Sequence, residues 1–482
     1  MKITLRSYQK RTESNAGEFI YNSPHKRGLS IAPTGSGKAI STATISKLTN
    51  DKCLVVQPSY ELLIQNLEKS RLIGLDPSVF SASAGKKEIS DLTYVTPLSI
   101  VNHPELFKDF NIVIIDEAHE NMTKGLKGGK VDTKSKFIEF LDYINPKKVI
   151  GLTATPIQLT QSRAGAELKM VNRSMRSYWY QADIFDVTQI NEIYDKYWAE
   201  LNYRPISYNS KGLRLNSTGN DFTQESIIQN YKLNNNNTRI LDQYEQLLSE
   251  GNKSILTFVP SVNEGHELKK LNKDFEFIFD KTPKKEREAI IKAFKRGDIP
   301  NLLNCETLVT GFDHPHLDSI ILGRETNSFA VYLQIIGRVV RPIVMPDGSI
   351  FKKKGTILDL TGNYKRFGSV ENITFEKQDY TKGWAMWNGD KIMTGYPFEN
   401  WDMPTRNEIE KLYKSTLIKI GNPDQIIFPF GKHKGKTLSN IFKFDKGYLK
   451  WLLTNKEFEW KSANLKQLKK EIETIFKKEI LN

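Results

Sequence analysis

The sequence has few cysteines and no long hydrophobic run. Only two of its 482 residues are cysteines, Cys53 and Cys305, and each lies in an apolar segment far from the other. Two such cysteines exclude a disulfide-stapled fold and a cysteine-rich metal site, and they indicate buried thiols in a reducing compartment. No stretch of about 18 apolar residues occurs, so no membrane-spanning helix is predicted. The first residues lack the apolar core of a secretory signal, which favours a cytoplasmic protein.

Positive charge is in excess. Lysine and arginine number 70 against 56 aspartates and glutamates, a formal net charge of +14. A basic excess of this size fits a polyanionic partner, because neutralising phosphates releases counterions. The alternative, from charge alone, is a soluble basic protein without such a partner. Residues 421–482 contain 13 lysines, no arginine and 7 acidic residues, so the positive charge is concentrated in this tail.

Short apolar runs rich in β-branched residues recur through the first 360 residues, separated by segments of helical length. This pattern is typical of a parallel sheet covered by helices on both faces, and it predicts an α/β fold. The runs are Cys53–Gln57, Ile112–Ile115, Lys148–Leu152, Ser254–Val259 and Ser319–Leu322.

The pattern is interrupted between about residues 160 and 250, and it ends near residue 360, which indicates more than one domain. We expect an α/β domain, a linker, a second α/β domain, an irregular connecting segment and a small basic α+β domain that ends in a helix over residues 463–478. Their expected bounds are, in that order, 1–215, 216–240, 241–365, 366–420 and 421–482.

The segment Ile31–Lys38 reads Ile-Ala-Pro-Thr-Gly-Ser-Gly-Lys. It follows an apolar run and precedes a helical pattern, so its glycines allow backbone N–H groups to cradle phosphates while Lys38 reaches the β and γ phosphates. The alternative is a plain glycine-rich turn. One position departs from the phosphate-loop pattern, because Ala39 stands where a Ser or Thr hydroxyl would bind Mg²⁺. The metal would then depend on phosphate oxygens, waters and an acidic residue elsewhere, and slow or absent hydrolysis is the alternative.

Four β-branched residues, Ile112–Ile115, are followed by Asp116-Glu117-Ala118-His119. A strand end places Asp116 opposite the phosphate loop, where it can hold Mg²⁺, and Glu117 can polarise the attacking water as general base. His119 would by itself be structural, but in this context we expect it to link the nucleotide site to the other domain.

Taken together, these residues resemble superfamily 2 helicases and translocases of the Asp-Glu-Ala-His class, with two RecA-like domains. The resemblance covers roughly the first three quarters of the chain, and further motifs match in order. Leu5–Gln9 resembles the adenine-reading motif, Val55–Leu62 motif Ia, Thr96–Leu98 motif Ib, Thr153–Pro156 motif III, Ser254–Ser261 motif IV, Leu308–Asp313 motif V and Gln334–Arg341 motif VI.

The resemblance implies the roles of individual residues. Catalytic roles fall on Lys38, Asp116, Glu117, Gln334, Arg338 and Arg341, with Asp116 as metal ligand. Binding of ATP falls on Arg6, Gln9, Pro33, Thr34, Gly35, Ser36, Gly37, Lys38, Ala39, Gly311 and Asp313.

The arginines of Gln334–Arg341 have a physical rationale. Charge accumulates on the γ-phosphoryl group in the transition state, and guanidinium groups from a second domain can stabilise it. Arg338 and Arg341 are three residues apart, which predicts that both project from one helix face. An exposed basic face is the alternative.

Phosphates of a nucleic acid can be held by hydroxyls, backbone amides and helix N-termini, without reading the bases. Each Ser or Thr alone is more often a helix cap. The residues that fit this chemistry are Pro58, Ser59, Thr96, Pro97, Thr153 and Thr310. Tyr178-Trp179-Tyr180 could stack on bases, but packing inside the first domain is the favoured interpretation.

The tail resembles a small C-terminal module found on some DNA exonucleases and phage proteins, on the segments Phe430–Lys436 and Tyr448–Trp451. Its lysine-glycine turn, with Lys432, Lys434 and Lys436, presents charge to phosphates and predicts auxiliary DNA binding. Tyr448 and Trp451 are expected in the core of so small a unit. A solvated basic surface or a protein-docking module is the alternative.

The resemblance implies an ATP- and Mg²⁺-dependent DNA helicase or translocase that acts on forked, branched or single-stranded DNA. It implies a monomer without membrane contact, alongside replication or recombination proteins, in the host cytoplasm if the chain is phage-encoded. The alternatives are an RNA helicase, an ATP-gated nucleic-acid-binding protein with weak hydrolysis, and the motor subunit of a restriction system.

Overall fold

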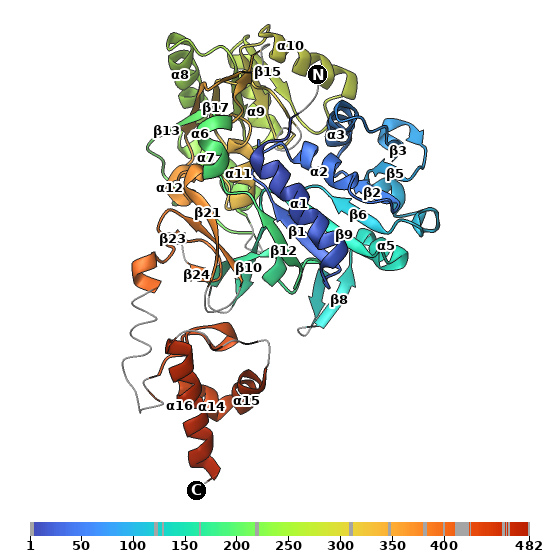
Figure 1. Cartoon of the computed structure of the whole chain (residues 1–482). Coiled ribbons are helices and arrows are strands. Elements are labelled where there is room, and N and C mark those ends of the chain that lie inside the picture. Colours follow the sequence, from blue (N-terminus) through green and yellow to red (C-terminus); the bar gives the residue numbers. More distant parts are fainter. Residues whose placement is uncertain are drawn as a thin grey trace. The chain divides into compact units, whose positions relative to one another are not determined.

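The computed structural model describes the chain at residues 4–119, 124–127, 130–162, 165–216, 221–307, 312–345, 349–378, 383–398, 401–409, 424, 426–455, 458, 460 and 463–480. Figure 1 labels the helices and strands along the chain, which divides into two compact units. The first unit contains Met1–Ile373 and Glu399–Trp401, and the second contains Thr374–Phe398 and Asp402–Asn482. Over the described residues, no helix combines the length and the apolar composition that crossing a membrane requires.

The first unit begins with an eight-stranded sheet in the order β12-β1-β9-β6-β2-β5-β3-β4. Its strands are parallel except for β4, which pairs antiparallel with β3. The strands are β1 Arg27–Ile31, β2 Cys53–Val56, β3 Ser78–Ser81, β4 Lys86–Lys87, β5 Leu92–Val95, β6 Ile112–Ile115, β9 Lys148–Thr153 and β12 Asp183–Val187. The helices are α1 Ser7–Asn22, α2 Lys38–Ser46, α3 Tyr60–Leu72, α4 Pro97–Ile100 and α5 Lys136–Ile144, and two hairpins join β7 Lys124–Lys127 to β8 Lys130–Lys134 and β10 Ile157–Ser162 to β11 Gly165–Met170.

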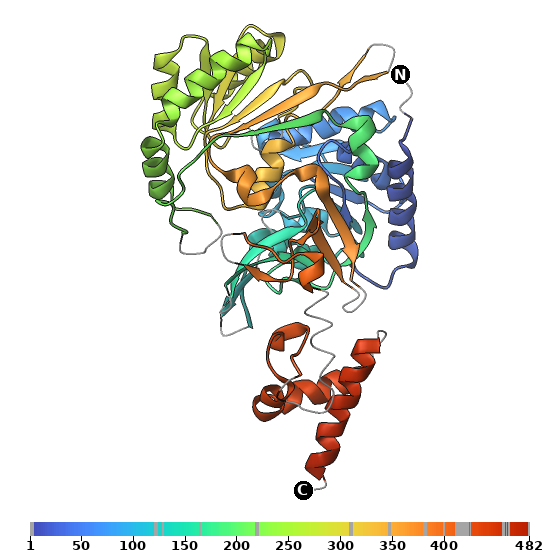
Figure 2. The same cartoon turned by 90° about the vertical axis from the view of Figure 1, so that its left-hand side faces the viewer.

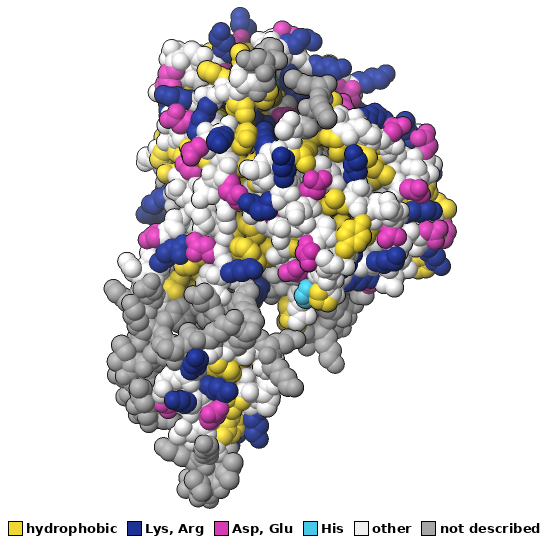
Figure 3. Space-filling model, viewed as in Figure 1, with side chains coloured by type: hydrophobic (Ala, Val, Ile, Leu, Met, Phe, Trp, Pro, Cys, Tyr) yellow, Lys and Arg dark blue, Asp and Glu magenta, His cyan; other side chains and the backbone are white. Residues whose placement is uncertain are grey.

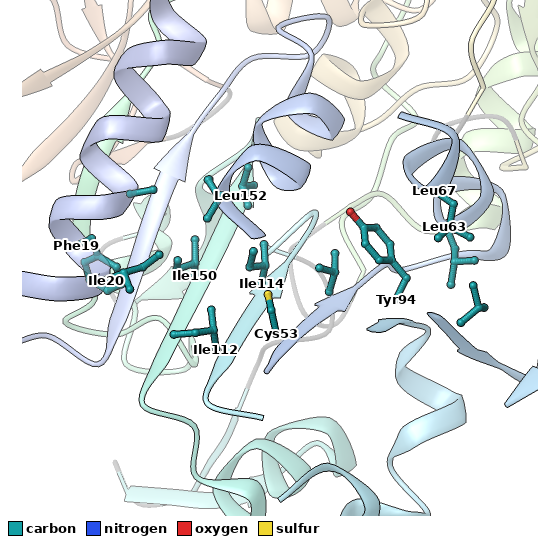
Figure 4. Packing of buried hydrophobic residues seen from close by; sticks show 14 residues of the cluster. Phe19, Ile20, Cys53, Leu63, Leu67, Tyr94, Ile112, Ile114, Ile150 and Leu152 are labelled. Carbon is teal, nitrogen blue, oxygen red and sulfur yellow. The ribbon is translucent and has the colours of Figure 1, made fainter. Parts of the chain in front are cut away.

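The core of this sheet follows from its near-continuous apolar strands. Alternate residues of β6 and β9, such as Ile112 and Ile150, point to one face and pack with α1 and α3 through Phe19 and Leu63 (Figure 4). Because both faces of a parallel sheet are covered, its strands carry apolar residues at almost every position. The predicted α/β pattern is therefore confirmed in this sheet.

The second sheet has six parallel strands in the order β13-β20-β17-β14-β16-β15, which lie side by side in Figure 2. The strands are β13 Glu200–Pro205, β14 Ile255–Phe258, β15 Phe275–Ile278, β16 Asn301–Asn304, β17 Ser319–Leu322 and β20 Lys354–Asp359. The helices of this part are α6 Asn191–Tyr197, α7 Gln224–Leu233, α8 Asn236–Ser249, α9 Val262–Leu271, α10 Lys284–Arg296, α11 Phe329–Ile336 and α12 Asn363–Phe367, and a short hairpin joins β18 Ile343–Val344 to β19 Ile350–Phe351.

The expected domain bounds differ from these sheets in two places. Residues 200–205, placed in the first α/β domain, form β13 at the edge of the second sheet. The expected linker over 216–240 contains α7, whose Tyr231 is buried in the core of the second sheet. The physical reason is that an edge strand alternates polar with half-buried residues, so it lacks the continuous apolar run that marks the central strands.

Apart from Ile373, the second unit contains a three-stranded sheet of β21 Ile373–Lys377, β22 Trp384–Asn388 and β23 Lys391–Ile392, with β24 Pro397–Phe398 following. Residues 366–420, expected to be irregular, therefore include regular strands. Farther along lie α14 Leu438–Phe444, α15 Lys446–Thr454 and α16 Ala463–Ile480, with an isolated β-bridge between Ile427 and Thr437. These helices share an apolar core that includes Phe428, Leu449 and Ile472.

Candidate active site

The sequence motifs of the first sheet lie together at the carboxyl ends of its strands. Residues 33–38 follow β1, 57–59 follow β2, 96–97 follow β5 and 116–119 follow β6. Parallel neighbours end at the same edge of a sheet, so segments far apart in the sequence meet there, and this edge is where open α/β sheets bind ligands.

The phosphate-loop segment adopts a conformation that depends on glycine. Gly37 has φ +84°, and a Cβ built there would lie 2.6 Å from the side-chain nitrogen of Gln9. The loop leads into α2, whose first turn offers backbone N–H groups. The hydroxyl of Ser36 is buried and has no hydrogen-bond partner among the described residues. A left-handed loop, a helix N-terminus and an unsatisfied buried hydroxyl together suit an anionic group.

The first turn of α1 packs directly on this loop. Tyr8 Oη and Gln9 Nε2 both donate to the Ser36 carbonyl, at 2.9 and 3.1 Å. The Arg6 guanidinium lies 3.8 Å from the centre of the Tyr197 ring and donates to Tyr8 Oη. The predicted adenine-reading residues thus lie beside the loop, and Tyr197 adds an aromatic face that the motifs did not indicate.

Lys38 and Glu117 form an ion pair with an Nζ–Oε1 distance of 2.8 Å. Glu117 has φ +46°, an uncommon conformation for a residue with a side chain. Asp116 is buried and accepts hydrogen bonds from Asn66 Nδ2 at 3.0 Å and from the Glu117 backbone at 2.9 Å. Asn66, in α3, is a positioning residue without a sequence signal of its own.

The two carboxylates of this pair differ in electrostatic environment. Burial, reinforced by the charge of Glu117, raises the pKa of Asp116 to about 6. Burial would also raise the pKa of Glu117, but Lys38 and His119 outweigh it and hold that pKa below its ordinary value. Glu117 is therefore the more readily ionised of the two, as a group that polarises water must be.

His119 connects the two sheets. Its Nε2 is 3.2 Å from Gln334 Nε2, and its Nδ1 is 2.9 Å from Thr153 Oγ1. Thr153 Oγ1 also accepts from the Thr155 backbone N–H at 3.0 Å. The hydrogen bonds thus run from α11 of the second sheet, through the Asp-Glu-Ala-His segment, to the end of β9.

Thr153 requires a correction. It was expected to contact nucleic acid, but it is fully buried and its hydroxyl is engaged by His119 and Thr155. Trp179, also fully buried, donates its Nε1–H to the Ala118 carbonyl at 2.6 Å. The aromatic segment 178–180 therefore packs behind the Asp-Glu-Ala-His turn, as the favoured interpretation had it.

Arg338 and Arg341 both donate to the Phe312 carbonyl, at 2.7 and 3.3 Å, and Arg341 also pairs with Asp313. They do not project from one helix face as expected, because α11 ends at Ile336 and both arginines follow it. Arg338 is buried beside the second sheet, and burial together with Arg341 lowers its pKa to about 9, while Glu117 acts in the opposite direction. The positive charge of Arg338 thus acts on the carboxylate of Glu117, which follows β6 of the first sheet.

The second sheet closes against the phosphate loop through Gly337. A Cβ built at Gly337 would lie 2.7 Å from the methyl group of Thr34. Trp198 donates its Nε1–H to the Thr34 carbonyl at 3.0 Å, and so fixes the same residue from another side. Glycine at position 337 therefore allows the segment with Arg338 to approach the loop. Thr310 and Gly311, predicted to bind nucleic acid and ATP, lie outside the described residues.

The remaining predicted nucleic-acid contacts of the first sheet lie at helix starts. Ser59 caps α3, where its Oγ accepts from the Leu62 backbone at 3.3 Å. Thr96 precedes α4, is almost fully buried, and shares its hydroxyl with Ser81 and Ser99. The side chain of Ser59 serves as a cap and the hydroxyl of Thr96 is engaged by two serines, so phosphate contacts at these positions would come from the backbone.

A cleft of about 490 Å³ opens between α3 and the segment after Phe312. Gln65 Nε2 donates to Asp313 Oδ2 across it, at 3.2 Å. Charged side chains of both signs line the cleft, among them Glu61, Glu68, Lys69, Lys295 and Asp313.

Three family models match successive parts of the chain. Residues 2–158 match the Type III restriction enzyme res subunit, and residues 217–342 match the helicase conserved C-terminal domain. Residues 428–457 match the exodeoxyribonuclease X-like C-terminal model. The first two matches contain the phosphate loop, the Asp-Glu-Ala-His segment and both arginines.

The chain belongs to the superfamily 2 helicases. This class consists of nucleic-acid-dependent ATPases built from two RecA-like domains, and the two parallel sheets fit that description.

Relatives carry corresponding descriptions. A protein assigned as the ATP-dependent helicase IRC3 of Saccharomyces cerevisiae is 27% identical, over 70% of this chain and 49% of its own length. The DNA 3'-5' translocase XPB2 of Sulfurisphaera tokodaii is 24% identical, over 70% of this chain and 79% of its own length. This superfamily 2 chain spans about half the length of the first of these relatives.

Solved structures share the fold at lower identity. The Type ISP restriction-modification enzyme LlaBIII bound to DNA aligns with a TM-score of 0.51 and 16% identity, over 75% of this chain and 28% of that one. A fragment assigned as the HsdR subunit of a type I restriction enzyme from Vibrio vulnificus YJ016 aligns with a TM-score of 0.54 and 19% identity. The alignment covers 76% of this chain and 65% of that fragment.

Proposed function

We propose that this superfamily 2 chain is an ATP-dependent DNA helicase or translocase that unwinds or remodels forked or branched DNA. One arrangement carries the proposal. Lys38 and Glu117 of the first sheet face Arg338 of the second, while His119 and Gln334 are joined across the same gap. A nucleotide bound between these groups would contact residues of both sheets. Its hydrolysis would therefore change the contacts that hold the two sheets together.

The residues around the phosphate loop fit ATP. Pro33–Lys38 and the start of α2 would bind the phosphates, and Arg6, Gln9 and Tyr197 lie where an adenine could stack and hydrogen-bond. Among the described residues, Asp313, held by Arg341, is the remaining predicted contact.

Among the described residues of this site, the buried carboxylate of Asp116 is available for Mg²⁺, since Glu117 is paired with Lys38, and Ala39 supplies no hydroxyl. Mg²⁺ commonly binds through one or two carboxylates together with substrate phosphates and waters, so this sparse donor set is sufficient. When bound, the ion neutralises charge on the phosphates. Glu117 would accept the proton of the attacking water, and Arg338 would stabilise negative charge at the terminal phosphate.

DNA would cross the carboxyl edges of the sheets, on backbone groups around Pro58–Ser59 and Thr96–Pro97. These contacts read phosphates and not bases, so binding would be independent of sequence. Two observations favour DNA over RNA: the match of residues 428–457 to an exonuclease module, and the description of a relative as a DNA translocase. An RNA helicase is the second candidate, and an ATP-gated clamp with weak hydrolysis is a third, favoured by Ala39.

The test is an ATPase and unwinding panel on forked, four-way, single-stranded and duplex DNA, with matching RNAs. We compare the wild-type chain with Glu117→Gln, which keeps the shape of the side chain but removes its basic group, and with Glu139→Gln on the exposed face of α5 as control. DNA-stimulated hydrolysis should be lost in the first variant and kept in the second.

The outcomes separate the candidates. Stimulation by RNA but not by DNA would replace the proposal with the RNA helicase. ATP-dependent DNA binding without hydrolysis in the wild-type chain would favour the clamp. Equal turnover in the Glu117→Gln variant would remove the proposed base from the mechanism.

A further inference from the structure

Trp451 is unexpectedly exposed. It was expected in the core of the small C-terminal module, but 54% of its surface is accessible. Leu449 and Leu452 occupy the inward side of α15 and fill the core, so Trp451 points outward. Large aromatic side chains dominate the energetics of cores and interfaces, so an exposed tryptophan with a second ring beside it is a candidate contact residue.

Trp451 belongs to a row of three side chains, which we call the aromatic strip. The Tyr448 ring stacks against Trp451, with centroids 5.8 Å apart and planes at 29°. The Lys432 ammonium lies 5.0 Å from the Tyr448 centroid on the neighbouring turn. A cation, a half-buried ring and an exposed ring thus follow one another along the surface.

Asp445 fixes the turn to the helix beneath the strip. Its Oδ2 accepts from Lys432 Nζ at 2.6 Å and from His433 Nε2 at 2.8 Å, while its Oδ1 accepts from the Tyr448 backbone at 3.1 Å. The geometry of the strip is therefore set by α15 and does not depend on a ligand.

The surroundings of the strip are strongly basic. Residues 426–455 contain six lysines and one acidic residue, and that residue, Asp445, is already paired. Lysine and hydrophobic side chains share the face of this unit seen in Figure 3. The cores of protein–protein interfaces are depleted in lysine, so this composition suits a polyanion better than a protein partner.

We propose that the aromatic strip Lys432–Tyr448–Trp451 binds single-stranded DNA, with an unpaired base stacked on the exposed face of Trp451 and phosphates beside the lysines. This inference rests on the proposed function, because it assumes DNA as the substrate. In a duplex the bases already stack on one another, whereas an unpaired base can cover an aromatic ring. The strip would then hold the strand that the motor releases or follows.

The test uses the full chain and measures binding of labelled oligothymidine, of oligouridine and of a blunt duplex. Trp451→Leu keeps an apolar side chain without a ring face, and Trp451→Phe keeps the ring face. We expect Trp451→Leu to weaken oligothymidine binding by up to about 5- to 150-fold, the range that alanine substitution gives for base–aromatic stacks, and Trp451→Phe to retain most of it. Duplex affinity should change little.

Control variants and measurements distinguish a loss of base stacking from a loss of fold stability. Tyr21→Leu removes another exposed aromatic ring, 65% accessible, from the first unit and should have no effect. The thermal midpoint and DNA-free ATPase of each variant should match the wild type. The leucine and phenylalanine variants lose a similar exposed surface, so a difference in affinity between them reflects the ring.

The proposal that the aromatic strip binds single-stranded DNA would be refuted if Trp451→Leu left the oligothymidine affinity unchanged. An equal loss of affinity for the blunt duplex would refute it as well. So would an effect confined to oligouridine. These results differ from failure of the proposed function, in which the wild-type chain itself would neither bind DNA nor show DNA-stimulated hydrolysis.

Discussion

Glu325 carries a prediction about stability and pH. The residue lies between β17 and α11, is fully buried, and has no hydrogen-bond partner for either carboxylate oxygen among the described residues. Burial raises its pKa to about 8, although the charge of Arg366 opposes this. We predict that Glu325→Gln, which keeps the shape and removes the charge, stabilises the fold at high pH.

The magnitude follows from proton linkage. The folded chain holds this proton more tightly than the unfolded chain, whose glutamate has the ordinary pKa of about 4.3. The contribution of Glu325 to the free energy of unfolding is therefore fully present below a pH of about 4.3. It is lost as the pH rises from there through about 8. At about 1.4 kcal/mol for each pKa unit, the advantage of the Gln variant should grow by roughly 4 kcal/mol between pH 5 and pH 9.

The assay is the thermal midpoint of both chains across this pH range, since several domains exclude a single free energy of unfolding. The midpoint of the variant should rise relative to wild type by roughly 10 °C from low to high pH. Glu288→Gln, on an exposed position of α10, serves as control and should show no such trend. A difference between Glu325→Gln and wild type that stays constant with pH would refute the argument.

The remaining predictions concern the motor and its tail. Lys38→Ala should abolish DNA-stimulated ATPase, and retained turnover would remove the phosphate loop from the mechanism. Ala39→Thr should preserve or tighten the Mg²⁺ dependence of turnover, whereas collapse of activity would mean that the metal is held differently. Gln334→Ala removes the hydrogen bond to the other sheet, so DNA-stimulated kcat should fall about twofold to tenfold with little change in ATP-free DNA affinity; an unaltered kcat would contradict coupling through it. Deletion of 421–482 should weaken DNA binding and flatten its salt dependence while sparing basal ATPase, and an unchanged salt slope would argue against a phosphate-binding tail.

The central strands could be predicted from the sequence, and the edge strand could not. Runs such as Ile112–Ile115 are buried on both faces, so every position is apolar and the signal is strong. Glu200–Pro205 has polar residues at alternate positions and pairs with β20, a strand far along the chain. Its membership of the second sheet depends on that distant partner.

The motif residues were predicted as a set, but their local geometry was not. The spacing of Arg338 and Arg341 indicated one helix face, yet α11 ends at Ile336, before both arginines. Thr153 matches its motif, but only the fold shows that its hydroxyl is used internally. Trp451 shows the same limit, because helical spacing tells which residues share a face and not which face is buried.

If a nucleotide binds at this loop as proposed, its phosphates would compete with Glu117 for Lys38. The Lys38 ammonium can pair fully either with the Glu117 carboxylate or with incoming phosphates, because both compete for one positive charge. Both side chains of the pair are largely shielded from water. An arriving nucleotide would therefore take the cation away and leave the carboxylate free to accept a proton. Without nucleotide, Glu117 would stay paired with Lys38. Nucleotide binding would free Glu117 to act as a base, so no further event would be needed to activate it.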